Sequence, residues 1–349
     1  MPELQEIIYK LKNYNGKPLT FMEVCGTHTA SISENGIPFL LSEKIRLVSG
    51  PGCPVCVTVA EYIDVLIDYS KQENTVVASF GDMLRVPGSK ESLKDAMASG
   101  GKVKMVYSPL ELLDIASGDI NTTYIFAAVG FETTAPVYAV LIEEAIKRKI
   151  TNIKLLTALK TMPKAIEFLC KSGSNINGFL APGHVAVITG VNDFKILADK
   201  YNLPFVVSGF EGQELIASIY ALCNLADKGV VKNLYKRAVT DNGNEAAKNC
   251  VNKYFEPCDA VWRGIGRLQN SGIALKKEYS DFDAGSKAIM KDTKVNPACQ
   301  CSDVIIGKKS PFQCPLFGKI CTPENPQGAC MVSTEGSCYS YYVNDRKDF

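Results

Sequence analysis

The chain has 349 residues, 46% of them hydrophobic, and its 38 basic and 37 acidic residues leave a formal net charge of +1. This length allows two or three domains with proper cores, and the balanced charge offers no field to recruit nucleic acid or an anionic membrane. The 13 cysteines and the lack of an apolar export signal predict a cytoplasmic protein that uses thiols for metal binding or redox chemistry. We expect no nucleic-acid partner and no membrane span.

The first 15 residues predict a helix. A strand over residues 18–24 then delivers the sequence CGTH at 25–28, with Cys25 expected at an accessible strand end. His28, one of only two histidines, is three residues from this thiol and is predicted to tune its protonation. A hydrogen-bonded structural histidine is the alternative.

The sequence GPGCPVC at residues 50–56 forms the second thiol segment, between a predicted strand and a helix expected over 57–72. Cys56 is then expected near a helix N-terminus, which favours a thiolate. A CxxC pair in this setting is typical of redox-active or metal-bound thiols. Two inert buried thiols at Cys53 and Cys56 are the alternative.

Strand-turn-helix units repeat as far as about residue 238, which is typical of parallel α/β layers. The sequence Gly-Phe-Glu follows a predicted strand twice, with Glu132 and Glu211, and His184 lies in another strand-end turn. Ligand-facing groups usually lie at such strand ends, so we expect these three side chains at a cleft. Helix capping is the alternative for the glutamates, and no glycine-rich phosphate-binding motif is present.

Beyond residue 240 the α/β alternation stops, and six of the 13 cysteines lie between residues 299 and 338. Four of them are spaced along a segment rich in proline and glycine: Cys314, Cys321, Cys330 and Cys338. Four thiolates on a loop-rich scaffold favour an iron-sulfur cluster over zinc, whose structural sites usually show paired CxxC knuckles. Cys299 and Cys301 are a tighter pair, left outside this set as spare or alternative ligands.

We therefore predict an α/β fold with two related Rossmann-like, parallel-sheet lobes and a cysteine-rich, loop-rich iron-sulfur region. The expected ranges are 1–48 for the N-terminal helix and strand with CGTH, 49–147 for the first lobe with CPVC and GFETT, 148–238 for the second lobe with PGHV and GFE, and 239–349 for the iron-sulfur region.

Five phrases, in this order, resemble the HypD family: CGTH at 25–28, GPGCPVC at 50–56, GFETT at 130–134, PGHV at 182–185 and CPLFGKICTP at 314–323. The family comprises [NiFe]-hydrogenase maturation factors. The resemblance implies a scaffold and electron donor for assembly of the Fe(CN)2CO unit of the hydrogenase active site. The chain departs from the family only slightly in the first motif, where Thr29 stands in place of the usual glutamate.

In this family HypD binds the small chaperone HypC, iron is held between one cysteine of each protein, and HypE delivers cyanide. The resemblance implies that Cys25, with His28 nearby, holds this iron, which is a transient cargo. It also implies that Cys53 and Cys56 are the redox-active pair. A [4Fe-4S] cluster is implied at Cys314, Cys321, Cys330 and Cys338.

Two interpretations from other classes stay open, because no signature of a known catalytic class is present. One is an iron-sulfur thiol-disulfide reductase acting through Cys53 and Cys56, which requires neither Cys25 nor a chaperone. The other is a zinc-stabilised binding module with no chemistry. Metal analysis of anaerobically purified protein separates the zinc module from the other two.

Overall fold

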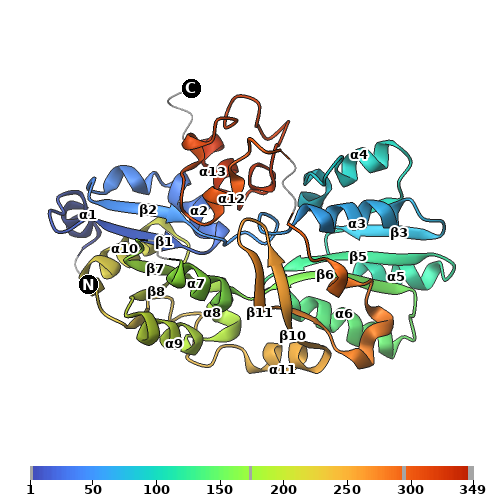
Figure 1. Cartoon of the computed structure of the whole chain (residues 1–349). Helices are drawn as coiled ribbons and strands as arrows, with labels where there is room; N and C mark the ends of the chain where they lie inside the picture. The colour runs from blue at the N-terminus through green and yellow to red at the C-terminus, as the bar shows by residue number, and fades with distance from the viewer. Residues whose placement is uncertain (1–2, 173–174, 293–295, 345–349) are drawn as a thin grey trace.

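The computed structural model describes residues 3–172, 175–292 and 296–344. Two β-sheets lie side by side, each packed with helices, and the cysteine-rich C-terminal segment lies over their junction (Figure 1). The predicted α/β class, with two parallel-dominated sheets and a cysteine-rich region, is confirmed and is consistent with two Rossmann-like lobes. Among the described residues, no helix combines the length and apolar character needed to cross a membrane.

The first sheet has five parallel strands. Their spatial order is β2 (Ile45–Ser49), β1 (Leu19–Glu23), β7 (Gly178–Pro182), β8 (Phe205–Ser208) and β9 (Val231–Asn233). The helices around it are α1 (Leu4–Lys12), α2 (Gly26–Glu34), α8 (Gly183–Thr189), α9 (Asn192–Tyr201) and α10 (Gly212–Leu225). The strands β7 and β8 are buried at every residue, as expected for a parallel sheet covered on both faces.

The second sheet combines four parallel strands with an antiparallel hairpin. Its order is β10 (Phe255–Trp262), β11 (Gly266–Leu275), β6 (Ile153–Lys160), β5 (Thr123–Gly130), β3 (Thr75–Ser79) and β4 (Val103–Met105). Its helices are α3 (Ala60–Ser70), α4 (Leu93–Ala98), α5 (Glu111–Gly118), α6 (Ala135–Lys147) and α11 (Glu245–Tyr254). Helix α7 (Met162–Lys171) contacts both β11 and α9, and so packs between the lobes.

Regular structure is sparse in the cysteine-rich segment, which contains α12 (Cys301–Ile305), α13 (Ser337–Asn344) and short 3-10 turns. The 3-10 turns of the described chain are at Ile37–Leu40, Gly81–Arg85, Lys277–Phe282, Ser286–Ala288, Pro311–Gln313 and Ala329–Met331. Helix α13 packs against α2, so the end of the chain returns to the helix that follows the CGTH motif.

Beyond the α/β alternation, which the sequence predicts to stop near residue 240, β10 and β11 form an antiparallel hairpin that the sequence does not predict. Its strands extend the second sheet through pairing of β11 with β6. A register shift lies between Cys258 and Ala260, and a proline stands at position 257. Both interrupt the two-residue alternation by which a half-buried strand is recognised in sequence.

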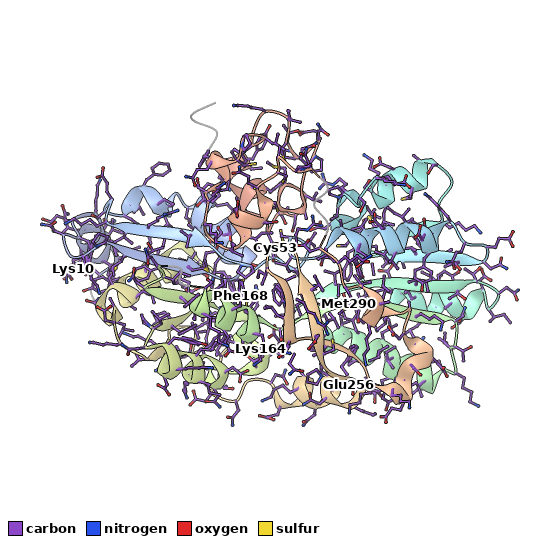
Figure 2. All side chains as sticks on the ribbon, viewed as in Figure 1. Lys10, Cys53, Lys164, Phe168, Glu256 and Met290 are labelled. Carbon is purple, nitrogen blue, oxygen red and sulfur yellow. A yellow bond between two sulfur atoms is a disulfide. The ribbon has the colours of Figure 1, made fainter. Side chains whose placement is uncertain are left out.

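Strand pairing also crosses the predicted domain ranges. Strands β1 and β2, from the range 1–48, pair with each other and with β7, whereas β6, from the range 148–238, pairs with β5. The chain passes between the sheets three times, after β2, after β6 and after β9. The first crossing is the segment that carries GPGCPVC, so this motif lies at the junction of the lobes, where Figure 2 labels Cys53.

Candidate functional site

The CGTH and GPGCPVC segments meet at one edge of the first sheet. Strands β1 and β2 are paired in register as far as Glu23 and Ser49, so the two segments leave neighbouring strand ends. The amide of Gly26 donates to the carbonyl of Gly52 at 3.0 Å. A Cβ atom at Gly52 would lie 2.3 Å from the backbone nitrogen of Cys25. The two backbones therefore touch, and only glycine fits at position 52.

Cys25 is the N-cap residue of α2 and is only 7% exposed, in contrast to the accessible thiol expected from the sequence. The C-terminal segment covers this position, because a Cβ at Gly26 would lie 2.4 Å from the Cβ of Glu335. The hydroxyl of Thr27 donates to Glu335 Oε1 at 3.0 Å. Burial and then the Glu335 carboxylate raise the pKa of Cys25 to about 12, while the backbone amides of His28 and Thr27 oppose this rise.

Glu23, the last residue of β1, is a buried carboxyl group beside Cys25. Its Oε1 accepts a hydrogen bond from the Thr29 hydroxyl at 2.5 Å, and its Oε2 accepts one from the Cys25 amide at 3.2 Å. Burial raises the pKa of Glu23 to about 8, so the carboxyl group is mostly protonated near neutral pH. The sequence motifs do not include this residue, although an acidic residue at the end of an apolar strand is a visible signal.

His28 is fully buried, and its ring does not pair with the Cys25 thiol. Its Nε2 lies 3.1 Å from the Gly209 carbonyl oxygen, and its Nδ1 has no hydrogen-bond partner among the described residues. The ring packs on Phe210, with centroids 4.8 Å apart, and His184 stacks on Phe210 at 3.9 Å. Burial lowers the pKa of His28 to about 4, so the imidazole is neutral. The sequence predicts that His28 tunes the protonation of Cys25, but neither ring nitrogen forms a hydrogen bond with the Cys25 thiol among the described contacts.

The two glutamates of the Gly-Phe-Glu sequences have different surroundings. Glu132 accepts a hydrogen bond from the Met162 amide at 2.8 Å, and its Oε2 is buried without a partner among the described residues. Burial raises the pKa of Glu132 to about 7. Glu211 is exposed and forms a capping box with Glu214 at the start of α10. For Glu211 the structure therefore shows helix capping, the alternative to a ligand-facing position at a cleft.

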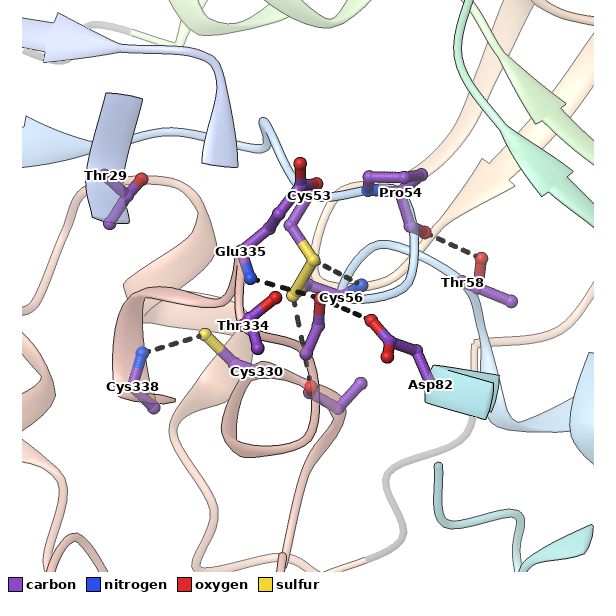
Figure 3. The surroundings of a disulfide bond; sticks show 12 residues. Thr29, Cys53, Pro54, Cys56, Thr58, Asp82, Cys330, Thr334, Glu335 and Cys338 are labelled. Carbon is purple, nitrogen blue, oxygen red and sulfur yellow. Dashed lines mark hydrogen bonds between the residues drawn. A yellow bond between two sulfur atoms is a disulfide. The ribbon is translucent and has the colours of Figure 1, made fainter. Parts of the chain in front are cut away.

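Cys53 and Cys56 form a disulfide, with their Cα atoms 5.2 Å apart (Figure 3). The amide of Cys56 also donates to Cys53 Sγ at 3.1 Å, and both residues are buried. The sequence predicts a helix from Val57, but α3 begins at Ala60, because the backbone of Val59 is extended, with φ -73° and ψ 155°. Val57 instead belongs to a turn, in which its amide donates to the Cys53 carbonyl at 3.2 Å. Cys56 therefore lies in a turn and not at a helix N-terminus. Redox activity of this pair stays a prediction.

All six cysteines of the C-terminal segment line one cavity, together with Phe317, Gly328 and Met331. The six are Cys299, Cys301, Cys314, Cys321, Cys330 and Cys338. Cys299 and Cys301, left outside the predicted ligand set, thus lie with the other four. Gly328 allows this, because a Cβ there would lie 2.9 Å from Cys299 Sγ. In the ranges that the structure describes, no three ligating side chains surround a position for a single metal ion.

The cysteine cavity adjoins the disulfide. Cys56 Sγ lies 4.0 Å from the carbonyl oxygen of Ala329, the residue before Cys330. Figure 3 shows the disulfide facing the loop that carries Cys330 and Glu335. Within this loop, the amide of Cys338 donates to Cys330 Sγ at 3.3 Å. The disulfide, the cavity and the cover over Cys25 are therefore parts of one continuous site.

Arg263 is a buried cation at the edge of this site, 6% exposed. Its Nε donates to the Thr58 carbonyl at 2.7 Å, while its Nη2 is buried without a hydrogen-bond partner among the described residues. A hydrogen bond to Cys301 and burial raise the pKa of Cys299, and the Arg263 guanidinium opposes this rise. The positive charge therefore acts on the cysteine cavity, and no acidic side chain of the described residues pairs with it there.

The comparison with protein families identifies the family of this chain. A family model for HypD, described as the hydrogenase formation hypA family, matches residues 2–345. The chain belongs to the HypD family. Hydrogenase maturation factor HypD2 of Bradyrhizobium diazoefficiens is 38% identical over 343 residues, which cover 95% of this chain and 90% of that protein.

Similar relatives occur in distant organisms. Hydrogenase maturation factor HypD of Escherichia coli K12 is 37% identical over 334 residues, or 93% of this chain and 89% of that protein. A putative hydrogenase expression/formation protein of Methanocaldococcus jannaschii is 38% identical over 328 residues, or 93% of this chain and 91% of that protein.

In this HypD chain, three polar residues outside the quoted motifs complete the site, namely Glu23, Arg263 and Glu335. Glu23 and Arg263 are charged residues that adjoin apolar strand sequences, and this is the sequence signal that finds them. Glu335 lies in a polar turn and has no such signal. Its place over Cys25 follows only from the packing of the C-terminal segment.

Replacing Glu23 with glutamine should change how stability depends on pH. The unfolded carboxyl group ionises near 4.5 and the folded one near 8, so the folded protein binds more protons between these values and wild type loses stability as pH rises through them. The slope is at most about 1.4 kcal/mol per pH unit. Glu23→Gln removes this term, so its free energy of unfolding relative to wild type should increase from pH 5 to pH 8 in urea titrations.

The matched control is Glu43→Gln, because Glu43 is exposed. Its free energy of unfolding relative to wild type should stay constant over the same range. A pH-independent difference for Glu23→Gln as well would mean that the folded Glu23 is already ionised.

Proposed function

We propose that this chain is a scaffold in [NiFe]-hydrogenase maturation on which the Fe(CN)2CO unit is assembled. The relatives named hydrogenase maturation factors support this role. The observation that carries it is the convergence of three thiol sites from distant parts of the chain: Cys25, the Cys53–Cys56 disulfide and the cavity of six cysteines. Assembly of a metal unit requires such soft ligands in a partly enclosed place.

Cys25 is the proposed ligand of the cargo iron, with a cysteine of a HypC-type chaperone as the second ligand. A metal ion deprotonates a coordinating thiol, and so opposes the burial that raises the pKa of Cys25 to about 12. The backbone amides of α2 act in the same direction as the metal. Because Glu335 covers this position, docking of the chaperone must displace the turn around Glu335. A HypE-type protein is the proposed cyanide donor.

A [4Fe-4S] cluster is proposed in the cysteine cavity, held by Cys314, Cys321, Cys330 and Cys338. The donor set fits, because these thiols are buried and line one cavity. The unpartnered Nη2 of Arg263 also fits, since a cluster with four thiolate ligands is a net anion and balances this charge. When bound, the cluster supplies one-electron transfer.

A second candidate function is a thiol-disulfide reductase. The contact between Cys56 Sγ and the loop of Cys330 favours it, because a disulfide beside a redox centre is what such a reductase requires. In this case Cys53 and Cys56 do the chemistry, and Cys25 has no role. The zinc-stabilised module is the third candidate and requires no redox change at Cys53 or Cys56.

Cys25→Ala should abolish the cyanide and carbonyl infrared bands of the protein isolated anaerobically with its chaperone. The reason is that the cargo iron loses the ligand supplied by this chain. Infrared spectroscopy measures the bands, and hydrogenase maturation is assayed in parallel. Cys250→Ala is the matched control, because Cys250 lies on α11 outside the site. Retention of the bands in Cys25→Ala would show that the iron is bound at another residue. If variants of Cys53 or Cys56 alone lost the ability to reduce disulfides, the reductase would be favoured.

Alanine at Cys314, Cys321, Cys330 or Cys338 should each remove the broad visible absorption and most of the bound iron, because a four-thiolate cluster loses a ligand. The measurements are absorption spectra and iron and sulfide analysis after anaerobic purification. Cys299→Ala and Cys301→Ala are matched controls from the same cavity and should keep the cluster. Loss of the cluster from Cys301→Ala, with retention in one of the four, would redefine the ligand set. Stoichiometric zinc would support the binding module.

Arg263→Gln should lower the reduction potential of the cluster, by roughly tens of millivolts, because a nearby buried positive charge favours the reduced, more negative state. Potentiometry followed by electron paramagnetic resonance measures the shift. Arg263→Lys is the matched control, because it keeps the charge and should retain most of the wild-type potential. Equal reduction potentials in wild type and Arg263→Gln would mean that Arg263 does not act on the cluster and serves only as the hydrogen-bond donor to the Thr58 carbonyl.

A further inference from the structure

A separate cavity of about 220 Å³ lies in the second lobe. It is lined by the end of β6, the β10–β11 hairpin, the start of α3 with the residues before it, and residues 286–290. None of the six cysteines proposed around the cluster lines it. Met290, one of its wall residues, is labelled beside the hairpin in Figure 2. Its walls are largely apolar, with Val59, Tyr62, Ile273 and Ile289 among them.

Lys160 is the charged group that distinguishes this cavity. It is the last residue of β6, lines the cavity and is 3% exposed. Its ammonium lies 5.9 Å from the ring centroid of Trp262, and within the described parts of the chain it has no hydrogen bond and no ion pair with an acidic group. Burial lowers the pKa of Lys160 to about 8, so at neutral pH the side chain is still mostly protonated.

The other charged side chains of the cavity wall are already paired. Arg267 donates to Asp259 at 2.8 Å, and Lys287 pairs with Glu256 at 3.1 Å. Neither acidic group is therefore free to balance Lys160. The Cys258 thiol of the same wall favours the Lys160 charge, but burial raises the pKa of Cys258 and so favours its neutral form. The nearby Arg263 has the same sign as Lys160 and opposes its charge. A buried cation without a counter-charge is costly, and the described residues supply no paired anion for Lys160.

We propose that this cavity binds a small organic anion whose carboxylate or phosphate group pairs with Lys160. At about 220 Å³ the cavity is smaller than the roughly 300–1,000 Å³ of pockets for drug-sized ligands, so it suits a smaller molecule. A lysine ammonium is a compact point charge and suits a single oxyanion. The apolar residues of the wall pack on the remainder of the ligand. This inference does not depend on the proposed role in maturation.

Thermal unfolding in inorganic phosphate, acetate or chloride at equal ionic strength tests the proposal. At roughly 50 mM, an anion that binds only the folded state raises the midpoint by mass action. Wild type should be stabilised by phosphate or acetate relative to chloride, and the more effective anion identifies the head group. Lys160→Met should lose this response, and its midpoint in chloride should be no lower than that of wild type. Lys287→Met, which changes a paired lysine of the same wall, should respond as wild type does.

An equal response in Lys160→Met and wild type, or no response of wild type to either anion, overturns the proposal. A second measurement needs no variant. Trace reductive methylation, mapped by mass spectrometry, compares Lys160 with Lys154 of the same strand, whose ammonium donates to the Asp281 carbonyl. The effective anion should slow methylation of Lys160 and leave Lys154 unchanged. Equal rates at Lys160 with and without the anion also overturn it.

Discussion

The close approach of Gly52 to the backbone of Cys25 is the contact on which the site depends. It follows from the parallel pairing of β1 and β2 in register, since both segments then leave the same sheet edge. Any side chain at residue 52 would separate them. The same segment carries the chain from the first sheet to the second. One backbone contact therefore relates the Cys25 thiol to the disulfide and fixes where the disulfide lies between the lobes.

Burial then decides the charge of the groups around this contact. It raises the pKa of Glu23 and of Cys25 and lowers that of His28, so the neutral form is favoured in each case. Arg263 is different, because an arginine guanidinium stays protonated in proteins. Its unpartnered Nη2 makes the neighbourhood of the cysteine cavity positive. The surroundings of Cys25 are thus nearly neutral, whereas those of the cysteine cavity favour an anionic occupant.

Local features of the site were predictable, and spatial ones were not. The apolar runs of β1 and β5, ended by glycine or a polar residue, give their strand boundaries to within a residue or two, and the GPGCPVC sequence predicts a tight turn. Strand order is different, because β1 pairs with β7 more than 150 residues away and nothing local encodes that contact. The direction of the His28 ring depends on how α2 packs against Gly209. The inclusion of Cys299 depends on the absence of a side chain at Gly328.

The cysteine-rich segment joins the two lobes through contacts on both sides. Ser33 of α2 donates to the Ser340 carbonyl at 3.2 Å, and Arg85 of the second lobe donates to the Val332 carbonyl at 3.4 Å. The segment has little regular structure of its own, so the proposed cluster would supply order that its backbone hydrogen bonds do not. Metal binding that orders such a segment adds its free energy to folding. Occupancy of the cysteine cavity by the proposed cluster would therefore be coupled to the cover over Cys25, because one segment forms both.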